Sequence, residues 1–278
     1  MRIEKRKKVA TIHKNLQSIT EAQETSPVKV QTLGGFQLWV EDHLINSKEW
    51  RRDIALQLFQ FLITARHRRG LHKETIMDRV WEEADTKTGE QNFKAALHGI
   101  NKVLEPNRQS RTESKYIIRQ GQTYQLNLEA FWIDVDAIEE LIAYGNNILE
   151  EEPKMALQAY RQAIELYKGV YLPNRVYQDW SCEQRERIQM LVLGTIILLS
   201  ERLVNENPLE SIRLTEQALI IDAAWEDAYK IQMQAYLKKG NRPMAIKAYQ
   251  RCVEVLDKEF GLEPLPDTKK LFQSIGSR

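Results

Sequence analysis

Cysteine, glycine and proline are all scarce in this chain of 278 residues. It contains two cysteines, twelve glycines and eight prolines. Two thiols, Cys182 and Cys252, cannot build a disulfide framework or a four-thiolate zinc site. The longest apolar run, residues 190–199, has about half the length of a membrane span. The basic N-terminus leads into no apolar stretch and is therefore not a secretory signal. We expect a soluble cytoplasmic protein with no membrane partner.

Residue patterns that would support catalysis or metal binding are also lacking. Of the five histidines, His67 and His72 lie five apart, but no carboxylate or thiol pattern completes a metal site around them. Gly34-Gly35 lacks the spaced glycines and the following helix of a phosphate-binding loop. The sequence thus predicts no enzyme, no metal site and no cofactor.

Charge is almost balanced overall, with 40 basic and 39 acidic residues, but it is sorted along the chain. Residues 1–27 carry six basic and three acidic side chains, and residues 28–128 carry sixteen and twelve. The remaining residues have a net charge of −6. A positive front half indicates a polyanionic partner for that half alone, and a mixed solvated surface is the alternative interpretation.

The chain begins with a stretch that lacks apolar periodicity, and we expect residues 1–27 to form a flexible basic tail. The basic cluster of the tail, which could touch phosphate or remain solvated, consists of Lys5, Arg6, Lys7 and Lys8.

From Val28 to Val40 apolar residues alternate around Gly34-Gly35, which predicts a small antiparallel sheet that continues to Leu44-Ile45.

Three stretches of helical periodicity follow the sheet. The first runs from Ile54 to Ala65, with Gly70 as its expected C-terminal cap. The second is short and covers residues 76–81. The third is expected to begin with a capping box at Thr88 and Gln91 and to end before Pro106. Its buried stripe is Phe93, Ala96, Leu97, Ile100 and Leu104, and its outer face is Lys94, His98, Asn101 and Lys102.

Two short apolar runs, 116–118 and 124–128, flank Gln120-Gly121-Gln122, and this pattern predicts a β-hairpin. The order of sheet, three helices and hairpin is that of a winged helix. In that fold the third helix enters the DNA major groove, and the hairpin lies against the neighbouring backbone. We therefore expect a winged-helix domain over residues 28–128.

The second half of the chain repeats itself. Residues 211–218 align with residues 245–252 at an offset of 34 residues, which is the tetratricopeptide period. An earlier copy, 156–163, lies 55 residues before the first of these, and the extra residues include an aromatic-rich loop at 169–180. Stacked helical pairs of this kind form a concave binding surface and carry no chemistry of their own.

The predicted fold is therefore mainly α, with an N-terminal α/β winged helix-turn-helix domain followed by an all-α tetratricopeptide-repeat domain. The repeat domain is expected to cover residues 129–278, with its first helix starting at a capping box of Asp136 and Glu139. Its aromatic residues sit mostly at helical spacing and are expected in the core. Tyr171 and Trp180, in the loop between repeats, are expected to support packing between the two domains rather than to bind a ligand.

Short runs in both halves of the chain carry a resemblance to a known family: Trp50-Arg-Arg52, Arg79-Val-Trp81, Asn92-Phe-Lys-Ala-Ala-Leu97, Val103-Leu-Glu-Pro106, Tyr116-Ile-Ile-Arg-Gln-Gly121 with Tyr124, Tyr171-Leu-Pro173, Asp179-Trp180, Glu186-Arg187, Trp225-Glu-Asp-Ala-Tyr229 and Glu259-Phe-Gly-Leu-Glu-Pro264. In order and spacing they make residues 28–278 similar to the SARP-type bacterial transcriptional activators. That family joins an OmpR-like winged helix to a tetratricopeptide "bacterial transcriptional activator domain".

The resemblance implies sequence-specific binding of double-stranded promoter DNA, often at direct repeats, and recruitment of RNA polymerase at the bacterial nucleoid. Lysine donates to guanine O6 and N7, asparagine pairs with adenine, and flanking cations neutralise phosphate. The DNA-binding residues it implies are the base-reading Lys94, His98, Asn101 and Lys102, the hairpin residues Arg119, Gln120 and Gln122, and the phosphate-contacting Arg51 and Arg52.

The chain also departs from the family pattern. Gly99 and Asn101 stand where many relatives have arginine. In the hairpin, Thr123 replaces a usual glycine and Gln120 a frequent arginine. These differences lower the expected number of phosphate contacts. No phosphoacceptor domain or ATPase segment is recognisable, so regulation is expected to come from the repeat domain. That domain would form a homodimer, contact RNA polymerase, or hold a protein or small-molecule effector in its groove.

A different function class fits the same domains. The tetratricopeptide groove would bind a protein partner, and the winged helix would act as a docking module with little specific DNA binding. Charge sorting and the basic outer face of the third helix favour the DNA-binding hypothesis over this adaptor.

Overall fold

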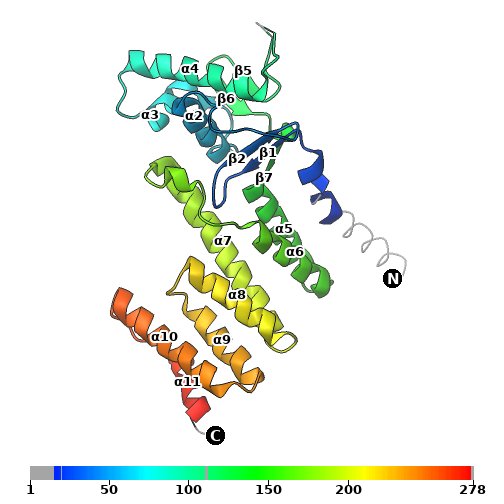
Figure 1. The fold of residues 1–278 in the computed structure, drawn as a ribbon, viewed down its shortest axis with the longest axis vertical. Helices are drawn as coiled ribbons and strands as arrows, with labels where there is room; N and C mark the ends of the chain where they lie inside the picture. Colours follow the sequence, from blue (N-terminus) through cyan, green and yellow to red (C-terminus); the bar gives the residue numbers. More distant parts are fainter. Residues whose placement is uncertain (1–15, 20, 110–111, 277–278) are drawn as a thin grey trace, which may run out of the picture. The chain divides into compact units, whose positions relative to one another are not determined.

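The computed structural model describes residues 16–19, 21–109 and 112–276, and the basic cluster at Lys5–Lys8 lies outside them. The chain divides into two compact units. Unit 1 comprises Met1–Glu140 and Leu166–Arg187, and unit 2 comprises Leu141–Glu165 and Ile188–Arg278. Figure 1 shows a sheet with helices and a hairpin in the first and only helices in the second.

The segment expected to be a tail contains a helix. Residues 16–19 and 21–25 are helical, and Leu16 is buried. The Gln17 side chain donates to Glu21 Oε1 one turn later, which is a typical helix-stabilising pair. The polar surface of this short helix explains why apolar periodicity did not reveal it.

The first sheet of unit 1 has the strand order β3-β2-β1-β7. Antiparallel pairing of β1 (Val28–Gln31) with β2 (Gln37–Val40), and of β2 with β3 (His43–Leu44), confirms the predicted small antiparallel sheet. Strand β7 (Phe131–Ile133) adds parallel to β1, with Val28 opposite Phe131. Alternation along β1 buries Val28 and Val30 against the helices, as expected of a sheet with one face on the core.

Three helices cover unit 1's core: α2 (Asp53–Thr64), α3 (Lys73–Val80) and α4 (Thr86–Leu104). Two expected boundaries are wrong. Helix α2 ends at Thr64 with Ala65 as its cap, and Gly70 instead donates its amide to Gln125 Oε1 at 3.2 Å. Helix α4 is capped by Asp85, whose carboxylate accepts from the Thr88 amide at 2.9 Å and from its hydroxyl. The acceptor at this N-terminus is thus the aspartate and not the threonine.

Gly99 lies where α4 crosses α2. A Cβ atom added at Gly99 would stand 2.7 Å from the Cβ of Ala55, closer than side chains approach. Position 99 therefore faces inward, and an arginine there would not reach DNA without moving α2. The glycine at this position is explained by helix packing, although glycine costs about 1 kcal/mol against alanine in a helix.

We expect Gly99→Ala to lower the free energy of unfolding by about 1–2 kcal/mol, because the overpacking cost exceeds the gain in helix propensity. The matched control is Gly194→Ala in the middle of α7 (Asp179–Leu203), where an added Cβ meets nothing within 4 Å. That control should stabilise the protein by about 0.5–1 kcal/mol. Urea unfolding of both variants measures the difference, and equal effects would contradict the close approach at Gly99.

A second sheet of unit 1, with the order β4-β6-β5, contains the predicted hairpin. Strands β5 (Ile117–Gln120) and β6 (Thr123–Leu126) pair across a two-residue turn in which Gly121 has φ = 62°. This left-handed conformation favours glycine at the first turn position. Strand β4 (Leu71–His72), just ahead of α3, pairs with the other edge of β6.

Helix α5 (Asp134–Ile148) begins two residues before Asp136, where the capping box was expected. The Asp134 carboxylate accepts from the amides of Thr32, Leu33 and Val135 and from the Thr32 hydroxyl, at 2.6–2.9 Å. Burial raises the pKa of this carboxyl, although the four donated hydrogen bonds pull it down. Asp136 instead forms a bidentate pair with Arg66, whose side chain is completely buried.

The aromatic-rich loop returns to unit 1 and packs on α2. Tyr171 forms an isolated bridge with Leu33, and its fully buried hydroxyl shares a 2.8 Å hydrogen bond with Thr64. Arg175, in the 3-10 turn η2 (Pro173–Arg175), donates to Asp53 and Gln60. Packing by this loop, and the pairing of β7 with β1, explain why the units do not divide at residue 128, where the domain boundary was expected.

Unit 2 contains the end of α5 and the repeats, built from α6 (Pro153–Leu166), the second half of α7, α8 (Pro208–Ile221), α9 (Glu226–Lys238), α10 (Arg242–Phe260) and α11 (Pro266–Gly276). The three repeated runs lie in α6, α8 and α10. Small residues in these helices permit close packing. Cys252 is completely buried in α10, and this burial raises the pKa of its thiol to about 12. Its thiol is thus a packing group rather than a nucleophile.

Candidate nucleic-acid interface

One face of α4 is exposed and mainly basic, with Glu90 at its edge, where Glu90 Oε2 lies 3.7 Å from Lys94 Nζ. Five exposed residues along it recur at spacings of four, three, four and four residues, so they share one side of the helix. Lys94 is the most informative of them, with 73% of its side chain exposed. We call this set the α4 stripe: Lys87, Gln91, Lys94, His98 and Lys102.

The α4 stripe differs from the predicted outer face at both ends. Lys87 was missed because the helix was expected to start at Thr88, and Gln91 was missed because its side chain was assigned to the capping box. Asn101 is only half exposed, and its Oδ1 atom is enclosed with no hydrogen-bond partner among the described residues. Bidentate pairing with adenine needs both atoms of the amide, so Asn101 would have to rotate before it could read a base.

Lys73 connects the hairpin turn to α4. Its backbone amide donates to the carbonyl oxygen of Gln122 at 2.9 Å, and its Nζ donates to Glu90 Oε1 at 2.8 Å. The hydrogen bond and charge of Lys73, together with the charge of Lys94, hold the pKa of Glu90 below its usual value. This carboxylate is therefore anionic near neutral pH and keeps the start of α3, the hairpin turn and the first half of α4 together.

Arg119 in the hairpin is held in place from two sides. Its Nε donates to the carbonyl oxygen of Gly121 at 3.0 Å, and its guanidinium carbon lies 5.6 Å from the centre of the Tyr124 ring. That ring packs edge-on against Phe93 of α4, with centroids 4.9 Å apart. A cation over an aromatic face is attracted to it, so the position of Arg119 is coupled to the helix.

The remaining hairpin residues are exposed at the turn. Gln120 and Gln122 present their side chains to solvent on either side of Gly121. Thr123, which stands where relatives have glycine, donates its hydroxyl to the Gln120 carbonyl at 2.8 Å. This hydrogen bond closes the turn, so the departure from the family pattern has a local structural role.

Arg51 and Arg52 lie at the N-terminal end of α2. Both are exposed, and Arg52 occupies the N-cap position with no side-chain capping bond. Ala55, whose amide donates to the Arg52 carbonyl, is the residue that faces Gly99. The two arginines are therefore within one helical turn of the place where α2 meets the middle of α4. Arg51 has φ = 55°, a conformation that few residues other than glycine adopt.

Two other features are absent from the described part of the chain. No group of three or more histidine, cysteine, aspartate or glutamate side chains there could hold a metal ion. No helix among residues 16–19, 21–109 and 112–276 has the length and apolar character needed to cross a membrane.

Comparison with known proteins adds a family and a fold. The family model described as "Bacterial transcriptional activator domain" matches residues 133–276. Among solved structures, Mycobacterium tuberculosis EmbR in complex with a low affinity phosphopeptide is similar, with a TM-score of 0.74 and 14% identity. The similarity covers 90% of this chain and 65% of that one, so the chain spans somewhat less than two thirds of its length. No curated protein matches the sequence.

Proposed function

The chain belongs to the bacterial transcriptional activator domain family, as a transcriptional regulator of the SARP type, and we propose that it is a sequence-specific DNA-binding activator. The observation that carries the proposal is the α4 stripe, an exposed basic surface with one carboxylate, Glu90, at its edge, joined to the hairpin turn through Lys73 and Glu90. The EmbR likeness, at 14% identity, supports the fold. Its phosphopeptide ligand is not carried over to this chain.

In the proposed complex, α4 enters the major groove of double-stranded promoter DNA. Lys87, Gln91 and Lys94 lie toward its N-terminal end, the part of a recognition helix that contacts base edges. His98 and Lys102 continue the contact along the groove. Lysine donates hydrogen bonds to guanine, and glutamine pairs with adenine. Both contacts require exposed side chains, and those of the α4 stripe are exposed.

The hairpin contacts the neighbouring backbone in this proposal. Arg119, fixed between Gly121 and Tyr124, meets a phosphate with the guanidinium nitrogens that the Gly121 carbonyl leaves free. Gln120 and Gln122 contact the backbone or the minor groove beside it. Arg51 and Arg52 neutralise phosphate where α2 meets α4. Contacts of this kind position the protein and make its affinity depend on salt.

The repeat domain has a different role in the proposal. Its stacked helical pairs form the surface for a homodimer, for RNA polymerase, or for an effector in the groove. Dimerisation through this domain would place two winged helices on direct repeats, and polymerase contact would make the regulator an activator. The protein would then act at the nucleoid.

Arg119→Ala should flatten the dependence of DNA affinity on salt. Each lost phosphate contact removes roughly 0.9 from the slope of log K against log salt concentration, so the slope should fall by about one. Arg213→Ala, an exposed arginine of α8, should leave the slope unchanged. Titrations between 50 and 200 mM salt, a range over which such contacts change affinity by orders of magnitude, measure the difference. An unchanged slope for the Arg119 variant would remove this residue from the interface.

A further inference from the structure

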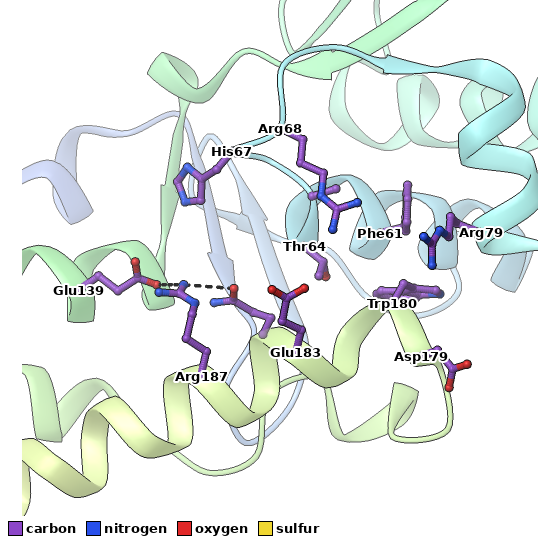
Figure 2. A pocket seen from close by; sticks show the side chains of 12 residues that line it. Phe61, Thr64, His67, Arg68, Arg79, Glu139, Asp179, Trp180, Glu183 and Arg187 are labelled. Atoms are coloured by element: carbon purple, nitrogen blue, oxygen red, sulfur yellow. Dashed lines mark hydrogen bonds and ion pairs between the residues drawn. The ribbon is translucent and has the colours of Figure 1, made fainter.

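Unit 1 contains a cavity of about 420 Å³ that is separate from the proposed DNA interface. It is lined by residues of α2, of the loop after α2, of α3, of the first turns of α5 and of the N-terminal turns of α7 (Figure 2). No residue of α4 or of the hairpin contributes to it. The volume lies within the range of roughly 300–1,000 Å³ typical of small-molecule sites.

One wall of the cavity is aromatic and held rigidly. The rings of Phe61 and Trp180 pack edge to face, with centroids 5.7 Å apart and an interplanar angle of 88°. Trp180 Nε1 donates to Gln178 Oε1 at 3.1 Å, so the indole has its polar atom satisfied and its orientation set. Trp180 thus packs on α2, as expected, and also offers ring surface to the cavity.

Two opposite charges in the cavity have no partner. Arg68 and Glu183 extend into it from opposite sides, and neither forms an ion pair with any described residue. By contrast, Arg187 is paired with Glu139. In all, three guanidinium groups and three carboxylates line the space. This balance disfavours a ligand with charge of only one sign and favours one that carries both.

A buried hydrogen-bond donor also lacks an acceptor. Gln184 is 9% exposed, and its Oε1 accepts from the guanidinium of Arg187 at 3.1 Å. That bond fixes which end of the amide is oxygen, because the reverse orientation would place two donors against each other. The Gln184 Nε2 atom is buried and has no partner among the described residues. An unsatisfied buried donor is costly, and rotation of the amide toward the cavity would let an acceptor oxygen there relieve that cost.

We infer that this cavity binds a small zwitterion of the α-amino acid class with an aromatic or large apolar side chain. The ligand carboxylate lies between Arg68 and the Gln184 amide, its ammonium group meets Glu183, and its side chain packs on Trp180. Arg79 and Asp179, which line the cavity near Trp180, add one charge of each sign and preserve the balance. The inference does not depend on the proposed DNA binding.

Calorimetric titration of the full chain with L-tryptophan, L-phenylalanine and L-leucine tests the inference. We expect saturable binding of at least one of them. N-acetyl-L-phenylalanine lacks the ammonium charge and L-phenylalanine amide lacks the carboxylate, so each should bind about tenfold more weakly than its parent, as expected when one charged hydrogen bond is lost. No binding by any of the three, or equal binding of the derivatives, would overturn the inference.

Variants locate the site. Arg68→Gln and Glu183→Gln should each weaken binding of the parent amino acid about tenfold. Arg69→Gln and Glu186→Gln are the matched controls, since both residues are exposed neighbours that do not line the cavity. Thermal unfolding without ligand should be alike in all four, because the substituted side chains are exposed. Equal affinity of the cavity variants and the controls would place the ligand elsewhere and overturn the assignment.

Discussion

Asp134→Ala is expected to lower the free energy of unfolding by about 3–5 kcal/mol, the largest stability effect that we foresee for a single side chain. The carboxylate lies at 2% exposure and receives four hydrogen bonds. Its removal leaves the Thr32 and Leu33 amides and the Thr32 hydroxyl without acceptors in a buried place. Because these hydrogen bonds connect the residues after β1 to the start of α5, the variant should lose the polar contacts that hold the two elements together.

The measurement is urea unfolding followed by tryptophan fluorescence. Asp42→Ala is the matched control, since Asp42 also accepts one charged hydrogen bond, from Lys29 at 2.7 Å, but its side chain is 84% exposed. An exposed ion pair contributes about 0–1 kcal/mol, so the control should unfold close to the wild-type midpoint. A loss below about 1 kcal/mol for Asp134→Ala would contradict the role of this carboxylate as a buried acceptor.

The second large effect concerns DNA. Lys94→Ala combined with Lys102→Ala should reduce affinity for a specific duplex about hundredfold, because a good base contact is worth about 1–3 kcal/mol and two are removed. Affinity for unrelated DNA should fall much less, because the hairpin and the arginines of α2 still meet phosphate. The ratio of the two affinities, measured by fluorescence anisotropy at one fixed salt concentration, is the decisive quantity.

The control for this variant carries the same change in charge elsewhere. Lys238→Ala combined with Lys239→Ala removes two exposed lysines at the end of α9 in unit 2. Its specific affinity should match that of the wild-type protein. A loss of specific affinity in the control as large as in the α4 variant would show that net charge, and not the α4 stripe, governs binding.

Sequence periodicity was sufficient to predict α4 and most of its exposed face, because a long helix with one buried stripe leaves a strong repeating pattern. Its N-cap was misplaced by three residues, since Asp85 and Thr88 are both good caps and only the geometry shows that Asp85 accepts. The same error hid Lys87 and Gln91. Asn101 was placed on the outer face by spacing, and no periodic pattern could reveal that packing encloses its oxygen atom.

Long-range pairings were not predictable in the same way. Strand β7 has three residues, all buried, so it shows no alternation and was assigned to the helical domain. The bond between Tyr171 and Thr64 joins residues 107 apart, and local sequence carries no sign of it. The cavity beside Trp180 was missed for the same reason, because Arg68 and Gln184 come together only in the folded chain.

Capture of sheared genomic DNA from the source organism on the purified full chain, followed by sequencing, tests the central claim most directly. The Lys94→Ala/Lys102→Ala protein is run beside the wild-type protein. We expect sharp peaks that share a repeated motif with the wild-type protein, and their loss with the variant. Uniform coverage with both proteins would contradict sequence-specific binding through α4 and would favour an adaptor whose repeat groove binds a protein partner.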